Sequence, residues 1–193
     1  MIRKISSRGF TIVELLVVIV VIGVLAAVTV VAYNGIQQRA QNAKTQQALA
    51  AWLKGLQLYK AENGRWPAGW NCLGEGYLYG PTGTETSGVA QCRQTNSTTY
   101  VVENPSFNVT MKPYIGNTIP TPAFVTARST DTLWYRGLMY AYGGGGTATD
   151  VYIQAAYAGA ITCPPVGGVT PSLTGAAGGN TACYYQVGYT TDT

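Results

Sequence analysis

The sequence predicts an α+β protein in which a long N-terminal helix, hydrophobic first and amphipathic later, packs on a small antiparallel β-sheet head. Two observations indicate the helix: residues 10–32 are almost continuously apolar, and apolar side chains then recur at helical spacing over residues 49–59. A third indicates the sheet. Residues 65–193 contain all 9 prolines and 19 of the 24 glycines, with short β-rich runs between them. We therefore expect one helix followed by one folded head.

Composition favours an exported protein without catalytic chemistry. Hydrophobic residues make up 47% of the 193 residues and charged residues only 10%, so much of the surface must be polar without being ionic. The net charge of +4 is concentrated towards the N-terminus, which leaves no basic surface large enough to indicate nucleic-acid binding. Histidine, the commonest general base and metal ligand, is absent. We expect no enzymatic activity, no cofactor and no metal site.

The N-terminal part predicts a membrane helix. Residues 1–9 form a basic leader with Arg3, Lys4 and Arg8, and the apolar run of 23 residues from Phe10 to Ala32 follows it. As a helix this run spans about 34 Å, enough for a hydrocarbon core of about 30 Å. The positive-inside rule keeps the leader in the cytoplasm and sends the rest outward. We assign residues 10–33 to a transmembrane or filament-core helix.

Residues 34–64 are expected to continue this helix as its amphipathic half. The apolar stripe consists of Leu49, Trp52, Leu53, Leu56 and Tyr59. The pair Asn34-Gly35 is a weak point, although a single glycine costs only about 1 kcal/mol. The run ENGRWP at residues 62–67 predicts the end of the helix, because Asn-Gly can close a C-terminus and Pro67 cannot continue it.

Residues 65–193 are predicted to form the β-rich head. The runs at residues 132–142 and 149–158 indicate a hairpin, joined by a loop with four glycines at residues 143–146. TTYVVE and CYYQVGY, at residues 98–103 and 183–189, are further strand candidates. Asn104-Pro105 can open a short helix towards Lys112, which Pro113 opposes.

Four cysteines indicate disulfide bonds in an oxidising compartment. They form two pairs 20 positions apart, without a CxxC spacing or any histidine that would favour zinc. Three connectivities can be drawn. We favour Cys72–Cys92 and Cys163–Cys183, because each closes a short local loop, which stabilises by very roughly 3 kcal/mol.

Glu14 is the single charged residue inside the apolar run. The sequence TIVE at residues 11–14 fits a capping box, so one interpretation is that Glu14 caps its own helix. A second is a buried ion pair, because an unpaired charge at the bilayer centre costs about 2.5–3.5 kcal/mol. A cut between Gly9 and Phe10 would create an α-amine one helical turn away, and a neighbouring chain shifted along the axis could present that amine to Glu14.

These residues closely resemble the class III signal of type IV pilins and pseudopilins. The resemblance rests on the basic leader ending in Gly9, on Phe10, on the run GFTIVELLVVIVVIGVLAAV, and on Glu14 as the fourth residue after Phe10. It covers about residues 3–35, and ENGRWP is similar to the family's junction into the head. The pair Cys163 and Cys183 resembles the C-terminal disulfide loop of many pilins. The chain has no proline before Pro67, so a proline kink found in many members is not expected.

The resemblance implies a structural role. A prepilin peptidase would cut after Gly9 and methylate the amine of Phe10, and copies of the chain or other pilins would pack their helices into a filament. A platform protein and an ATPase would drive assembly, and Glu14 would pair with the Phe10 amine of a neighbour. The precursor would span the cytoplasmic membrane once with its head outside, and the assembled protein would be extracellular or in the cell envelope. DNA or a host surface stays open as a further partner.

Two alternatives remain. A pseudopilin of a type II secretion or DNA-uptake machine would use the same N-terminal chemistry. A disulfide-bonded secreted binding protein would instead have an ordinary signal peptide cut after Ala32, so that the mature chain begins at Tyr33 rather than Phe10.

Weaker patterns predict little. Residues 143–146 lack the Lys-Ser/Thr of a phosphate loop, and they are interpreted as a hairpin tip. Calcium binding by head loops is not favoured, because the candidate aspartates lack EF-hand spacing: Asp131, Asp150 and Asp192. The glycosylation triplet occurs at residues 96–98 and 108–110, a pattern that is frequent by chance.

Overall fold

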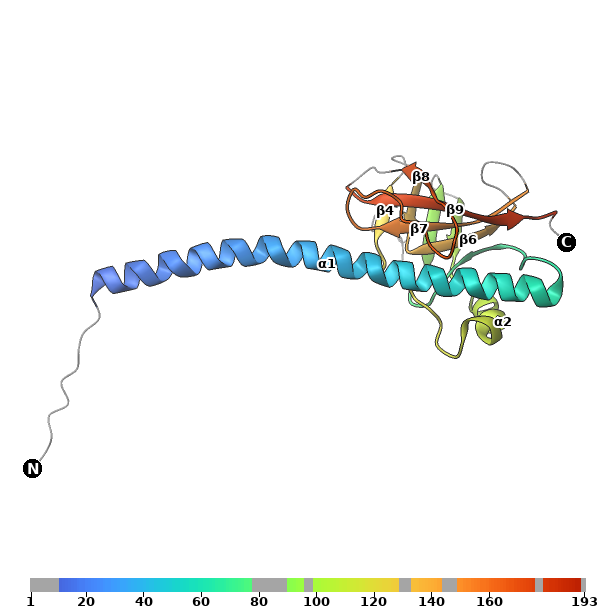
Figure 1. Cartoon of the computed structure of the whole chain (residues 1–193), viewed down its shortest axis with the longest axis horizontal. Coiled ribbons are helices and arrows are strands. Elements are labelled where there is room, and N and C mark those ends of the chain that lie inside the picture. Colours follow the sequence, from blue (N-terminus) through green and yellow to red (C-terminus); the bar gives the residue numbers. More distant parts are fainter. Residues whose placement is uncertain are drawn as a thin grey trace, which may run out of the picture. The chain divides into compact units, whose positions relative to one another are not determined.

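The computed structural model describes residues 11–77, 90–95, 99–128, 133–143, 149–175 and 179–191. The chain divides into two compact units, Met1–Gln37 and Gln38–Thr193. One helix of 52 residues, α1 (Ile12–Asn63), runs from the first unit into the second (Figure 1). It passes Asn34 and Gly35 without interruption.

Helix α1 ends where ENGRWP predicts. Its last residue is Asn63, and the N–H of Gly64 donates to the carbonyl oxygen of Lys60 at 2.8 Å. Gly64 has a φ of 70°, a left-handed conformation that costs glycine little. The predicted helix end is confirmed.

The head contains a second helix and nine strands among the described residues. These elements are β1 (Trp70–Cys72), β2 (Gln91–Thr95), β3 (Thr99–Val102), α2 (Pro105–Ile115), β4 (Thr126–Arg128), β5 (Leu133–Arg136), β6 (Leu138–Tyr142), β7 (Asp150–Tyr157), β8 (Ser172–Gly175) and β9 (Thr181–Tyr189). The strands expected near residues 98–103 and 183–189 are therefore present as β3 and β9. Helix α2 begins as predicted, because the side chain of Asn104 accepts hydrogen bonds from the N–H groups of Ser106 and Phe107. It continues through Pro113 to Ile115.

The strands form two antiparallel sheets where the sequence predicted one. The five-stranded sheet has the order β1-β6-β7-β9-β8, and the four-stranded sheet has the order β3-β2-β5-β4. The expected hairpin exists as β6 and β7, with Tyr140 opposite Ile153. Its first run, however, is divided at Gly137, so that β5 belongs to the other sheet. Gly137 has a φ of 62°, and a β-carbon there would lie 2.8 Å from the Tyr77 hydroxyl oxygen, so this turn between sheets requires glycine.

The amphipathic part of α1 lies between the five-stranded sheet and α2 (Figure 1). The predicted stripe forms the centre of the main core, with Leu49, Trp52 and Leu56 fully buried. On the α2 side, the rings of Trp52 and Phe107 stack with centroids 6.2 Å apart. Gly55 is required on this side, because a β-carbon there would collide with Ile115. The prediction that this stripe is core is confirmed.

Strand β7 is buried along its whole length because both of its faces are covered. All eight of its residues are buried. One face joins the core around α1 through Val151, Ile153 and Ala155. The other face joins two smaller clusters that include residues of the four-stranded sheet, to which it contributes Tyr152 and Ala156. The head is therefore layered as helix, helix, sheet and sheet.

Candidate functional site

The first turn of α1 forms a complete capping box. The Thr11 N–H and the Thr11 hydroxyl each donate to Glu14 Oε2 at 2.8 Å. In return, the Glu14 N–H donates to Thr11 Oγ1 at 3.2 Å. Two amides that a helix start leaves without partners are thus satisfied reciprocally. The capping contact expected for Glu14 is therefore present within a single chain.

Both hydrogen bonds that the capping box directs to the carboxylate use the same oxygen. They end on Oε2, and among the described residues no hydrogen bond to Oε1 is found. A carboxylate can accept about four hydrogen bonds through its two oxygens. Capping therefore leaves Glu14 able to accept from a second donor. Gly9 and Phe10, the two residues expected to flank a cleavage site, lie outside the described residues.

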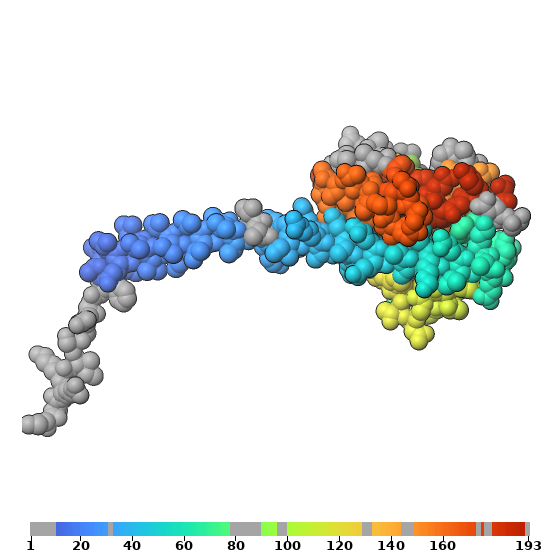
Figure 2. Space-filling model, viewed as in Figure 1, coloured from blue at the N-terminus to red at the C-terminus, as the bar shows by residue number. Residues whose placement is uncertain are grey.

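The apolar part of α1 carries its side chains outward on every side. The large apolar residues from Ile12 to Val30 are between 48% and 84% exposed, and the space-filling view shows one side of this segment as a blue rod (Figure 2). This helix is long and apolar enough to cross a membrane. Such a surface is not stable in water, and it requires lipid or other apolar helices around it.

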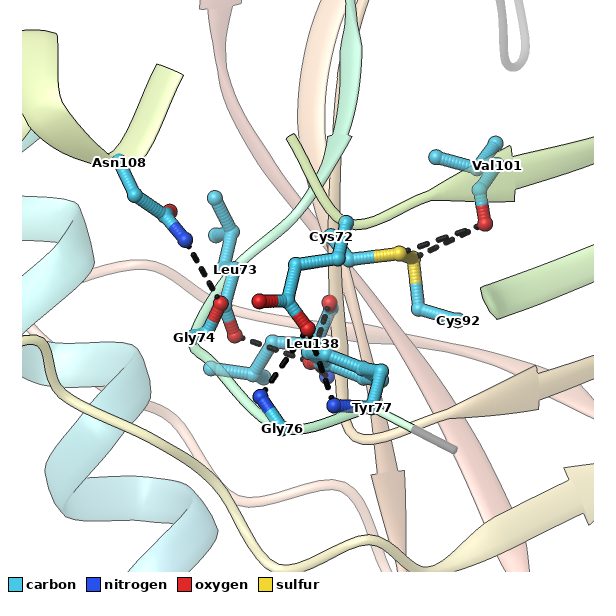
Figure 3. Close-up of a disulfide and its surroundings, with 10 residues drawn as sticks. Cys72, Leu73, Gly74, Gly76, Tyr77, Cys92, Val101, Asn108 and Leu138 are labelled. Atoms are coloured by element: carbon cyan, nitrogen blue, oxygen red, sulfur yellow. Dashed lines mark hydrogen bonds between the residues drawn. A yellow bond between two sulfur atoms is a disulfide. The ribbon is translucent and has the colours of Figure 1, made fainter. Parts of the chain in front are cut away.

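Two disulfides join the cysteine pairs that the spacing favoured. Cys72 is bonded to Cys92 and Cys163 to Cys183, each across 20 positions. Cys72 and Cys92 are fully buried, and both sulfur atoms approach the carbonyl oxygen of Val101 (Figure 3). The first bond ties β1, at the edge of the five-stranded sheet, to β2 in the four-stranded sheet. The second ties β9 to the segment that precedes β8.

The loop after β1 is held by the side chains of Glu103 and Asn108 and by the hydroxyl group of its own Tyr77 (Figure 3). Glu103 accepts hydrogen bonds from the N–H groups of Gly76 and Tyr77, each at 3.0 Å. The Tyr77 hydroxyl lies 2.9 Å from the carbonyl oxygens of Leu73 and Leu138. Burial raises the pKa of Tyr77 above its ordinary value. Hydrogen bonds from Glu103 and Tyr77 therefore fix this loop beside the first disulfide.

Several weaker sequence patterns have structural roles here. Asn108, in the second glycosylation triplet, is 1% exposed and donates from Nδ2 to the carbonyl oxygen of Gly74 at 2.9 Å, so a glycan could not be attached in the folded head. Asp150 is 5% exposed and accepts hydrogen bonds from Tyr184 and Gln186. Among the described residues, no group of three His, Cys, Asp or Glu side chains could hold a metal. Asp131, Asp192, residues 96–98 and most of residues 143–146 lie outside the described residues.

Sequence reasoning missed a contact between α1 and β7. The side chain of Asn42 donates to the carbonyl oxygen of Ala158 at 3.0 Å and accepts from the Ala158 N–H at 2.8 Å. The partners are 116 positions apart. In the sequence, Asn42 stands among other polar residues of α1, so no local signal predicts such a contact.

Residues 5–30 match the family described as the prokaryotic N-terminal methylation motif. The chain carries this N-terminal methylation motif. The match confirms the resemblance predicted from the leader, Gly9, Phe10 and Glu14, and it agrees with the exposed apolar helix.

Curated relatives of this chain are named type II secretion system core protein G. The protein from Klebsiella michiganensis is 38% identical over 65 residues, 34% of this chain and 46% of the relative. The protein from Klebsiella pneumoniae is 42% identical over 61 residues, 32% of this chain and 44% of the relative. The Escherichia coli (strain K12) protein is 40% identical over 62 residues, 32% of this chain and 43% of the relative. The chain thus spans less than half the length of these relatives, and no solved structure matches it.

Proposed function

We propose that this protein is a structural subunit of a type IV pilus-like filament. The observation that carries the proposal is the methylation motif at residues 5–30, which includes the start of a helix whose apolar side chains are exposed on every side. A single membrane helix would hold the precursor with its head outside the cytoplasmic membrane. Assembly would then replace lipid by the apolar helices of neighbouring copies, so that the same surface stays buried in both states.

Processing is part of the same proposal. A prepilin peptidase cleaves after Gly9, and the new amine of Phe10 is methylated. Leader removal places a cation close to Glu14, and Glu14 in one subunit receives the Phe10 amine of the next. The capping box is compatible with this pair, since it uses Oε2 and leaves Oε1 to accept. Each subunit would then be positioned along the filament axis by one buried ion pair, with a platform protein and an ATPase supplying the work of extraction.

A second candidate is a pseudopilin of a type II secretion machine. The relatives named above favour it, since all three carry the name type II secretion system core protein G. Their similarity covers about a third of this chain, so most of the chain lies outside it. Both candidates share the cleavage, the membrane helix and the packing of α1. They differ in whether the filament is extracellular or stays in the cell envelope.

The decisive experiment is the mass and N-terminal sequence of the protein recovered from sheared filaments. The proposal expects a chain that begins with methylated Phe10. A mature chain that begins at Tyr33 would instead identify an ordinary secreted protein and reject the filament. To separate the two candidates, the gene is deleted and surface filaments and secreted enzymes are scored: loss of filaments supports the pilin, and loss of secretion with filaments intact supports the pseudopilin.

A further inference from the structure

We propose that the head carries a binding groove for a neutral saccharide, at the end of α1 where β1 begins and α2 starts. The groove has a volume of about 350 Å³, which lies within the roughly 300–1,000 Å³ range of small-molecule sites. Its lining side chains combine aromatic rings with amides and hydroxyls: Tyr59, Trp70, Phe107, Asn71, Asn104, Ser106 and Thr110. This inference concerns the head alone and does not depend on filament assembly.

Asn71 is the polar group that points to a ligand. Its residue is only 3% exposed, and it lines the groove. Across the part of the chain that the structure describes, the amide of Asn71 has no hydrogen-bond partner. The amide can therefore still donate and accept at the groove surface, and this position favours a ligand that both donates and accepts. A saccharide hydroxyl does both.

The wall beside Asn71 is kept open by backbone conformation. Gly69 has a φ of 102°, which disfavours any side chain at this position. A β-carbon at Gly69 would also come within 3.4 Å of Nδ2 of Asn71. Any residue larger than glycine would therefore stand over the amide. Glycine leaves this face of Asn71 accessible from the groove.

Trp70 supplies a rigid aromatic rim. The Arg93 guanidinium lies 5.0 Å from the centroid of the indole ring, and Nε1 donates to the carbonyl oxygen of Gly143 at 3.0 Å. The ring is held in place, yet 38% of the residue remains exposed. Exposed rings of this kind contact the apolar C–H face of a sugar while nearby amides bind its hydroxyl groups.

The charge of the lining selects among ligands. None of the residues that line the groove is Asp, Glu, Lys or Arg. The free amides at the start of α2 are already used, because Asn104 Oδ1 accepts from Ser106 and Phe107. An anionic ligand would therefore find no cation among the lining residues and no unpaired amides at the start of α2. The groove suits an uncharged, hydroxyl-rich ligand.

The test uses the full chain in a sugar-free detergent and saturation-transfer NMR with neutral trisaccharides of glucose and of N-acetylglucosamine. We expect transfer from aromatic protons and a dissociation constant at or below about 10 mM. Asn71→Leu, which removes the amide at similar volume, should weaken binding at least about tenfold. The matched control Asn117→Leu changes an exposed amide away from the groove and should leave binding unchanged.

Two results would overturn the proposal. One is no saturation transfer from any trisaccharide, including the case in which a proline-rich peptide binds the groove instead. The other is equal binding by wild type and folded Asn71→Leu. If circular dichroism shows Asn71→Leu to be unfolded, Ser106→Tyr, at an exposed position of the lining, serves in its place. It should block binding while the head stays folded, and unaltered binding would reject the groove as the site.

Discussion

The side chain of Asn42 pairs with both backbone groups of Ala158, donating at 3.0 Å and accepting at 2.8 Å. Ala158 directly follows β7, the central strand of the five-stranded sheet. Asn42 therefore attaches α1 to the end of that strand near the beginning of the second compact unit, which starts at Gln38. No other side chain of comparable geometry joins α1 to this strand among the described residues.

We predict that Asn42→Ala lowers the free energy of unfolding of the head by about 1–3 kcal/mol, because it leaves two backbone groups of Ala158 without their protein partner. Hydrogen exchange should also accelerate in α1 around residue 42. Gln47→Ala, at an exposed position on the same helix, serves as the control, since it also removes a side-chain amide from α1 but not this contact. Equal stability of the two variants would mean that the contact contributes nothing.

The disulfides make a second prediction. Non-reducing peptide mapping of the exported protein should link Cys72 to Cys92 and Cys163 to Cys183. Replacing Cys72 and Cys92 together by alanine should cost about 3 kcal/mol, since the bond restricts a loop of 20 positions in the unfolded chain. Free thiols in exported protein would contradict the oxidising compartment, and crossed links would contradict the connectivity alone.

Alkaline pH should unfold the head through its buried tyrosines. Burial raises the pKa of Tyr152 from 10.0 to about 12, and burial also raises the pKa of Tyr77, Tyr140 and Tyr157. A raised pKa means that the folded head favours the neutral phenol. The stabilisation is present below pH 10 and is lost as the pH rises from 10 to about 12, because the unfolded chain ionises first.

Thermal melts across this pH range, read by circular dichroism with tyrosinate absorbance in parallel, test the prediction. Tyr152→Phe should lose less stability between pH 8 and pH 12 than wild type, because it removes one of the phenols that ionise only after unfolding. Full tyrosine ionisation near pH 10 in a head that is still folded would show that these phenols are not protected.

Many elements of this fold can be predicted from neighbouring residues in the sequence. The other elements depend on contacts between residues that are far apart along the chain. The end of α1 at Asn63 and the cap of α2 by Asn104 were predictable, because both depend on neighbouring residues. The division into two sheets could not be predicted, because a glycine such as Gly137 occurs both in a bent strand and in a turn between two sheets. The Thr11–Glu14 capping box could be predicted from four consecutive residues. The role of Asn42 depends on a contact with Ala158, far along the chain, and the role of Asn71 depends on the shape of the surface around it.

The last prediction separates the two roles of Glu14. Glu14→Leu removes the carboxylate but keeps an apolar side chain, so membrane insertion and cleavage after Gly9 should persist. If Glu14 pairs with a neighbour's Phe10 amine, assembly should fall sharply, because an unpaired buried charge costs about 3–5 kcal/mol. If Glu14 only caps its helix, the loss should be nearer 1 kcal/mol and filaments should still form.

Thr11→Val is the matched control, because it removes the hydroxyl that accepts from the Glu14 N–H and donates to Oε2, while the carboxylate stays. Each variant is co-expressed with wild type, and the fraction of variant subunits in sheared filaments is measured by mass spectrometry. The ion pair requires Thr11→Val to enter filaments nearly as well as wild type and Glu14→Leu to be largely excluded. Equal incorporation of Glu14→Leu at normal filament yield would reject the pair, and an equal, small loss of both variants would assign the defect to the cap.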